Sequence, residues 1–445
     1  MPQTTTKAGP ELGIRLDGGP DSFSPGDTIT GHVFRGKHIV TTEATLKVRL
    51  TGREKTKIIA GPSTRGIYRG RTTLISEEEH LQVLFQGPLH IAQASPPEEE
   101  DRTWSFTFTI PTHVWEGSDE PGDQAPPPRH SLPQTLPGTF TDSSGSSAQT
   151  EGFIEYAVWA ELQYDDHGST ETIDAIHPIT IKAVSLDPPI IDFRLTRHRQ
   201  YGLVSSYRLL PEVGRAGPSF SQRARSHFGS RKVPAFAGHM EIDTPAVIQL
   251  EHPGPIPLRL QFVPDGNVLR ASRIEDVTQK IQLVMLTMEI RAVMEINCDN
   301  GPGPWTSVSP TTRAMSVWSR LAFGSGTPPL YIPYATETSP VDVGEKVNLR
   351  LGYTGMMSKA FAQGTIHPSF STRHIKYTHR IYYELQARIA EEELKMSLET
   401  DVTILPPAGT SADTGYVGSG VGVTDEEELP PPPFDETWIR PPPSG

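Results

Sequence analysis

The sequence predicts an all-β protein built from antiparallel sandwiches, and two observations predict it. The first is a tight turn at Pro25-Gly26 that leads directly into a segment where Ile29, Gly31 and Val33 alternate with polar neighbours. The second is the recurrence of this alternation along most of the chain. A strand with one polar and one apolar face buries the apolar face most readily against a second sheet, which gives a sandwich.

Three further segments of the first half show the same period of two. In each, apolar side chains share one face and polar side chains share the other, as in a half-buried antiparallel strand. The apolar sets are Leu46, Val48 and Leu50; Trp104, Phe106, Phe108 and Ile110; and Ile154, Tyr156, Val158, Ala160 and Leu162. We therefore expect these segments to be strands around one core.

The second half repeats the plan of the first. Its strand patterns are Ile256, Leu258, Leu260 and Phe262; Val347, Leu349 and Leu351; and Ile381, Tyr383, Leu385, Ala387 and Ile389. Each half also ends on an apolar strand followed by a proline pair, at Pro188-Pro189 and at Pro406-Pro407, where strand pairing cannot continue. The echo predicts two sandwiches in tandem, over residues 12–187 and 188–407.

Three stretches have the composition of disordered chain rather than of packed core. Residues 116–150 consist mainly of Pro, Gly, Ser, Thr and Asp, which predicts a disordered insertion in the first sandwich. Residues 205–238 predict a basic insertion in the second. Residues 408–445 are rich in Gly, Ser and Thr, then acidic, then rich in proline, which predicts a disordered tail.

Composition excludes several classes of function. A net charge of −13 disfavours wholesale binding to nucleic acid, because the long-range field repels phosphate. The single cysteine, Cys298, excludes an internal disulfide, and neither a signal peptide nor an apolar run of membrane-span length is evident. These features predict a soluble protein of a reducing compartment.

Residue patterns for catalysis or cofactor binding are missing from the sequence. No nucleophile elbow, phosphate-binding loop, dinucleotide fingerprint or HExxH motif occurs. The histidine pairs His167/His177 and His374/His379 lack helical ligand spacing and neighbouring cysteines, so structural roles are favoured over a metal site. We expect neither an enzyme nor a cofactor.

Taken in order, the motifs resemble those of arrestin-like proteins, in particular the α-arrestins of filamentous fungi. The resemblance is carried by Phe23-x-Pro-Gly-Asp-x-Ile-x-Gly-x-Val33, by Trp104-x-Phe-x-Phe-x-Ile-Pro111 and by Gly152-x-Ile-Glu-Tyr156. It covers about residues 12–407 and implies two tandem immunoglobulin-like antiparallel β-sandwiches. It also implies an adaptor that binds cytoplasmic parts of membrane transporters or receptors and delivers a ubiquitin ligase.

Members of that family often carry a Pro-Pro-x-Tyr motif that binds WW domains of a HECT-type ligase. The corresponding partner-binding residues here are Pro430, Pro431, Pro432, Pro433 and Phe434. Proline preorganises the extended helix that WW grooves accept, and the phenyl ring can still pack. The missing phenol hydroxyl removes a hydrogen bond of about 0.5–1.5 kcal/mol, which weakens the motif severalfold. A proline-rich tail without a partner is the alternative.

A second candidate site is a run of basic residues on this acidic chain. It comprises Arg194, Arg197, Arg199, Arg208, Arg215, Arg223, Arg225, Arg231 and Lys232, opposed in sequence only by Glu212. Guanidinium groups suit carboxylates and phosphates, so the run, and chiefly Arg215, Arg223, Arg225, Arg231 and Lys232, is a candidate for binding acidic cargo or anionic lipid. A solvated insertion is the alternative.

The leading hypothesis is a cytoplasmic adaptor, peripherally associated with the plasma membrane or endosomes, that recruits a ubiquitin ligase for endocytosis and sorting. The alternative is a structural subunit of an endosomal sorting or coat complex with the same fold and no ligase. An enzyme on a β-sandwich is the third and least favoured hypothesis, because the sequence displays no convergent polar site.

Overall fold

The computed structural model describes residues 4–18, 22–59, 66–91, 102–115, 134–145, 149–213, 219–222, 233–298, 305–307, 317–322, 329–335, 339–352, 355–356, 361–362 and 366–409. All of them belong to one compact unit, Met1–Gly409, and the remaining unit is Thr410–Gly445. Among these described residues, strands make up 63% and helices 5%, which confirms the predicted all-β class.

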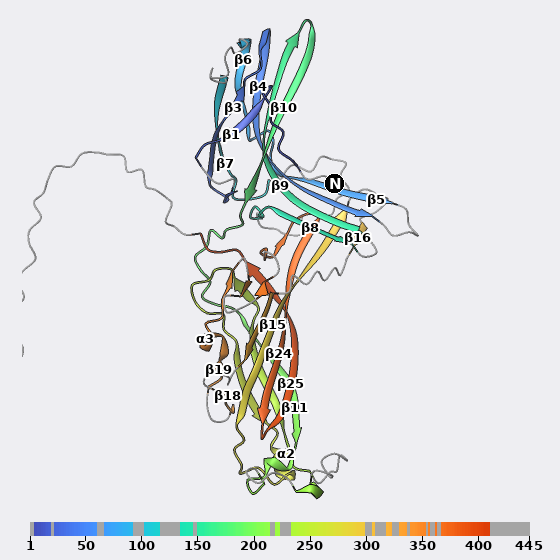
Figure 1. Cartoon of the computed structure of the whole chain (residues 1–445), viewed down its shortest axis with the longest axis vertical. Helices are drawn as coiled ribbons and strands as arrows, with labels where there is room; N and C mark the ends of the chain where they lie inside the picture. The colour runs from blue at the N-terminus through green and yellow to red at the C-terminus, as the bar shows by residue number, and fades with distance from the viewer. Residues whose placement is uncertain are drawn as a thin grey trace, which may run out of the picture. The chain divides into compact units, whose positions relative to one another are not determined.

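The strands of the first half form two sheets (Figure 1). One has the order β1-β3-β7, and the other has the order β2-β10-β9-β4-β5, with β6 beside β4 and β8 beside β9. In chain order these strands are β1 (Gly13–Leu16), β2 (Ser22–Phe23), β3 (Thr28–Arg35), β4 (Ile39–Ile59), β5 (Ile67–Ile75), β6 (Leu81–Ile91), β7 (Arg102–Thr109), β8 (Phe140–Gly145), β9 (Gln149–Asp166) and β10 (Ser169–Ile181).

The second half contributes a four-stranded sheet, β11-β12-β14-β19, and a nine-stranded sheet along β13-β25-β24-β15-β17-β22, with β16, β18 and β23 at its sides. A two-stranded sheet joins β20 and β21. The elements are β11 (Leu195–Ser205), η1 (Tyr207–Leu209), β12 (Ala235–Pro245), β13 (Val247–Gln249), β14 (Arg259–Pro264), α2 (Gly266–Ala271), β15 (Ile281–Cys298), β16 (Trp305–Ser307), β17 (Val317–Ala322), β18 (Leu330–Ile332), β19 (Val341–Asp342), α3 (Val343–Lys346), β20 (Leu351–Gly352), β21 (Gly355–Met356), β22 (Phe361–Ala362), β23 (Phe370–Ser371), β24 (Ile375–Ile389) and β25 (Glu392–Leu405).

The alternation of apolar and polar residues in the sequence corresponds to a buried and a more exposed face of the observed strands. In β9 the predicted apolar set from Ile154 to Leu162 is buried, and in β24 the set from Ile381 to Ile389 is buried too. Apolar side chains of the two first-half sheets belong to one cluster, and those of the two large second-half sheets belong to another. The predicted boundary between residues 187 and 188 stays a prediction.

The first-half cluster also contains side chains from the second half of the chain. Met294 and Ile296 of β15 and Ile375 and Tyr377 of β24 pack with residues of β4 and β9. The strands β4 and β15 are 21 and 18 residues long, so they reach beyond a single core. Because of this length, the two halves of the unit share apolar contacts.

One predicted strand is wrong. The set Val347, Leu349 and Leu351 yields strand only at Leu351–Gly352, and the short helix α3 precedes it. Asp342 caps this helix, because its carboxylate accepts a hydrogen bond from the backbone N–H of Glu345 at 3.2 Å. Val347 and Leu349 lie directly after this helix and outside any strand, so their spacing only resembles the period of two of a strand.

The structure corrects the limits of both predicted insertions. Within residues 116–150, Leu136 and Phe140 are buried and β8 pairs with β9, so the last part is folded. Within residues 205–238, Tyr207 and Leu209 are buried and β12 already begins at Ala235. In both segments, single large apolar residues pack into the core and keep the adjoining chain folded, although most of the neighbouring residues in the sequence are polar.

The folded part of the first insertion is fixed to β9 by a tyrosine. The hydroxyl of Tyr156 donates a hydrogen bond to the backbone carbonyl of Pro137 at 2.6 Å, and the tyrosine side chain is buried. Burial, followed by the nearby charge of Glu54, raises the pKa of Tyr156 well above its ordinary value, which keeps the hydroxyl protonated as a donor.

Replacing Tyr156 by Phe should therefore lower the free energy of unfolding by about 1 kcal/mol, because the Pro137 carbonyl loses its donor. Urea denaturation measures the change. Tyr331→Phe is the matched control, since this ring is 46% exposed and should tolerate the substitution. Equal stability of the two variants would contradict the anchoring role of Tyr156.

Candidate binding surfaces

Both binding sites predicted from the sequence lie outside the described residues. This holds for Pro430, Pro431, Pro432, Pro433 and Phe434, and equally for Arg215, Arg223, Arg225, Arg231 and Lys232. Their proposed roles therefore stay predictions.

The described part of the basic run is not an unopposed cationic surface. The guanidinium Nε of Arg197 lies 2.7 Å from the carboxylate of Asp243, and Arg199 Nη2 lies 2.7 Å from the carboxylate of Glu241. Both acids belong to β12 and stand directly across from the arginines in the β11–β12 register. The sequence interpretation, which found only Glu212 opposite the run, is corrected by these cross-strand partners.

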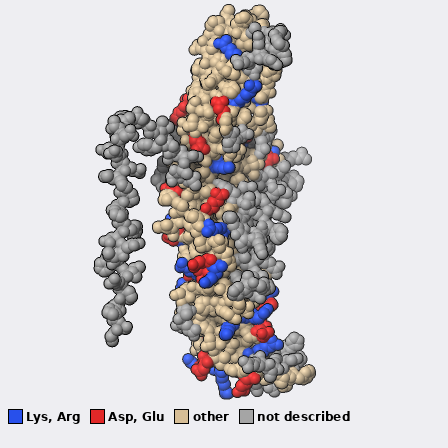
Figure 2. All heavy atoms as spheres, turned by 60° about the vertical axis from the view of Figure 1, so that its left-hand side comes forward, with Lys and Arg blue, Asp and Glu red and all other residues tan. Residues whose placement is uncertain are grey.

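The described residues on one face of the molecule mix both signs of charge (Figure 2). Figure 2 shows Lys and Arg side chains interspersed with Asp and Glu side chains over the face in view. On such a face each charge has neighbours of the opposite sign, which weaken its own local field. A charged binding site must therefore be sought in local arrangements.

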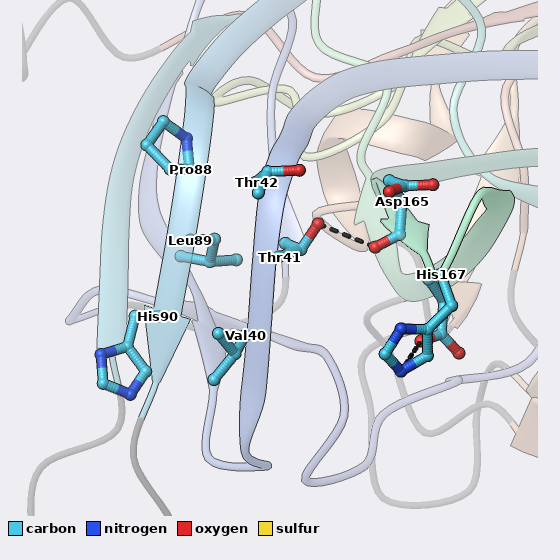
Figure 3. Close-up of a pocket in the computed structure, with 9 residues that line it drawn as sticks. Val40, Thr41, Thr42, Pro88, Leu89, His90, Asp165 and His167 are labelled. Carbon is cyan, nitrogen blue, oxygen red and sulfur yellow. Dashed lines mark hydrogen bonds and ion pairs between the residues drawn. The ribbon is translucent and has the colours of Figure 1, made fainter.

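One hollow of about 480 Å³ lies between β4, β6 and the turn that joins β9 to β10. Figure 3 shows His90 and His167 on opposite sides of it, and the Thr41 hydroxyl donates to the backbone carbonyl of Asp165 at 2.8 Å. His167 is fully exposed and lies 3.9 Å from Asp166. The lining combines the buried Thr41 and Leu89 with the exposed Val40 and His167. Because His90 and His167 lie on opposite sides (Figure 3), the hollow does not bring these two imidazoles together for acid–base chemistry.

Metal binding finds no support within the described ranges. No group of three or more His, Cys, Asp or Glu side chains there is placed to hold an ion. The lone cysteine, Cys298, is buried, and its sulfur lies 3.5 Å from the hydroxyl of Thr56. None of the helices among the described residues has the length and apolarity to span a bilayer.

A local concentration of basic side chains occurs on the solvent side of β4 and β5. It consists of Arg53, Lys55, Lys57, Arg69 and Arg71, which we call the basic face. Residues between them, such as Glu54, Thr56 and Gly70, are buried, so the period of two places the basic side chains on the opposite face. Arg69 and Arg71 are exposed there, whereas the side chains of Arg53, Lys55 and Lys57 are partly covered. In the sequence, the basic face is visible only as basic residues that alternate with buried ones. The sequence analysis did not predict this face, because it considered only how many basic residues occur close together in the chain.

Two glutamates of β9 balance part of the basic face. Glu155 accepts hydrogen bonds from Arg53 Nε at 2.8 Å and from the backbone N–H of Thr4 at 2.8 Å, and it pairs with Lys55 as well. Glu151 pairs with Lys57 at 3.2 Å. Burial favours the protonated form of Glu155, but the hydrogen bonds from Lys55 and Thr4 outweigh it, so the pKa of Glu155 is lowered and the carboxylate stays charged.

Behind the basic face lies a buried polar cluster that joins distant parts of the chain. The Glu54 carboxylate is fully buried and accepts hydrogen bonds from the hydroxyl of Thr372 and from the backbone N–H of His374 at 3.2 Å. The hydroxyl of Thr56 donates to the backbone carbonyl of Asn297 at 2.8 Å. These contacts hold β4 against the end of β15 and the turn before β24.

Comparison with protein-family models gives no match, and comparison with curated proteins gives none either. The structure itself defines the chain as an all-β protein with several antiparallel sheets. The arrestin-like resemblance is compatible with this architecture and is carried by the sequence motifs.

Proposed function

We propose that the chain is a non-enzymatic trafficking adaptor of the arrestin-like type, with two tandem immunoglobulin-like sandwiches that meet near residue 187. The observation that supports the fold most strongly is the pair of apolar clusters, one built mainly from the sheets of the first half and the other from those of the second half. Antiparallel sheets can keep one face in solvent, which leaves long polar faces and strand edges to contact other proteins.

In this proposal the chain works in the cytoplasm, at the plasma membrane or at endosomes. It binds cytoplasmic segments of membrane transporters or receptors and brings a HECT-type ubiquitin ligase to them for endocytosis and sorting. The ligase would bind the tail at residues 430–434, where four prolines precede Phe434. WW domains accept proline-rich segments because such segments are already extended before binding.

A pull-down with HECT-ligase WW domains tests the tail directly. Phe434→Ala should lower binding, because the ring that packs in the WW groove is removed. Phe434→Tyr should raise affinity severalfold, since a hydroxyl hydrogen bond contributes about 0.5–1.5 kcal/mol. Ser444→Ala is the control within the same tail. If wild type and Phe434→Ala bind equally, or neither binds, residue 434 is not the docking point.

The phenylalanine itself favours a second candidate function. A tail that has lost the tyrosine hydroxyl fits a structural subunit of an endosomal sorting or coat complex that needs no ligase. That subunit would occur in a large stoichiometric assembly, so the native size of the full chain in cell extracts separates the two functions. A size near that of the free 48.9 kDa chain would exclude the coat subunit.

A further inference from the structure

The basic face contains like charges directly opposite each other. In the β4–β5 register Lys57 stands across from Arg69, and Lys55 stands across from Arg71. Directly opposed like charges destabilise an antiparallel pair. On a chain with a net charge of −13, this arrangement calls for a compensating anion.

The glutamates of β9 do not supply enough negative charge on the described surface. Glu155 is shared between Arg53 and Lys55, and Glu151 is engaged by Lys57. Arg69 and Arg71 are exposed, and neither has an ion-pair or hydrogen-bond partner among the described residues. Two arginines at positions i and i+2 of one strand thus face solvent together.

The strand that carries these arginines also forms the end of its sheet. Among the described strands, only β4 pairs with β5. The outer edge is used at Leu74, whose carbonyl accepts a hydrogen bond from the backbone N–H of Trp115 at 2.9 Å. From Ile67 to Thr73 no described strand continues the ladder, so this edge can accept an additional strand.

We propose that the outer edge of β5 binds an extended acidic peptide as an added strand, with carboxylates at alternate positions paired to Arg69 and Arg71. Alternate residues of a strand point to the same face and lie about 6.6–6.8 Å apart. An added strand therefore repeats the spacing of the two arginines. Backbone hydrogen bonds contribute affinity, and the alternating charges set specificity. The inference concerns this edge alone and does not depend on the adaptor role.

Fluorescence anisotropy with the full chain tests the proposal. The probe is a labelled peptide of nine residues with Glu at every second position and Thr or Val between. Two further peptides are controls, one with the same composition but contiguous Glu, the other N-methylated at alternate backbone nitrogens. The alternating peptide should bind most tightly, and its binding should protect the β5 amides from hydrogen exchange.

The matched variants have equal charge. Arg69→Gln/Arg71→Gln should raise the Kd of the alternating peptide about tenfold, as expected for two exposed ion pairs. Arg388→Gln/Lys395→Gln removes two exposed charges from β24 and β25 and should leave the Kd unchanged.

Three results would overturn the proposal. Equal binding of the alternating and contiguous peptides would show that the spacing of the carboxylates does not matter and that general charge attraction explains the binding. Binding of phosphatidylserine vesicles that needs both arginines, without peptide binding, would assign the face to a membrane. If no peptide binds and Arg69→Gln/Arg71→Gln forms dimers, the arginines only guard the edge against pairing between copies.

Discussion

Replacing Glu54 by Ala should lower the free energy of unfolding by about 3 kcal/mol. The carboxylate accepts hydrogen bonds from the Thr372 hydroxyl and the His374 backbone N–H in a site without solvent access. Removing the carboxylate leaves the buried His374 N–H unpaired, at about 1–3 kcal/mol. The Thr372 hydroxyl keeps its other acceptor, the Ile375 carbonyl at 3.0 Å, and the cavity left by the side chain adds to the loss. The contacts join residues about 320 positions apart in the chain, so the loss should weaken the hold between β4 and the start of β24.

Guanidinium denaturation with a two-state fit measures this change. Glu54→Gln keeps one acceptor oxygen and should lose less stability than Glu54→Ala. Glu78→Ala removes a carboxylate from an exposed turn and should stay within about 0.5 kcal/mol of wild type. A Glu54→Ala variant as stable as Glu78→Ala would show that the buried cluster does not hold the two segments together.

The second large effect is a loss of stability in mild acid. His379 is buried in β24, and its Nδ1 lies 2.9 Å from the hydroxyl of Ser369. Burial, followed by the charge of nearby His367, lowers the pKa of His379 to about 3. Unfolded histidine has a pKa of about 6.5, so below this value the unfolded chain binds a proton that the folded chain rejects. The contribution of the neutral, buried His379 to stability is therefore fully present above pH 6.5, and it is lost progressively as the pH drops toward 3.

Between pH 7 and pH 5, protonation of this histidine in the unfolded chain should lower the free energy of unfolding by about 2 kcal/mol. Comparing wild type with His379→Gln at both pH values isolates the contribution, because glutamine does not titrate. The stability lost between pH 7 and pH 5 should be smaller in the variant by about that amount. Identical pH dependence of the two proteins would mean that residue 379 is accessible to protons in the folded state.

The sequence predicts the long strands well, because a period of two that continues over many residues matches the geometry of a strand and not that of a helix. The alternation around Ile29, Val48, Phe106, Val158 and Leu385 corresponds in each case to a strand with a buried face. Where the predicted secondary structure was wrong, contacts with distant residues or a local helix cap outweighed the local sequence pattern. Phe140 folds into the sheet despite its polar surroundings, and a helix cap at Asp342 precedes an apparent strand pattern.

Binding sites were harder to predict, and the reason is physical. Charge density drew attention to the run from Arg194 to Lys232, yet Arg197 and Arg199 find acids on the neighbouring strand, which only the register reveals. The basic face depends on pairing between Lys57 and Arg69, which lie on two strands of a hairpin. Contacts such as Glu54 with Thr372 carry no local sequence signal at all.

The adaptor account is tested most directly by affinity purification of the full chain from cells, followed by quantitative mass spectrometry. Wild type should co-purify a membrane protein together with a HECT ligase. Phe434→Ala should keep the membrane protein and lose the ligase, and ubiquitination of the membrane protein should fall with it. A single stoichiometric assembly that is identical for both chains and contains no ligase would contradict the account.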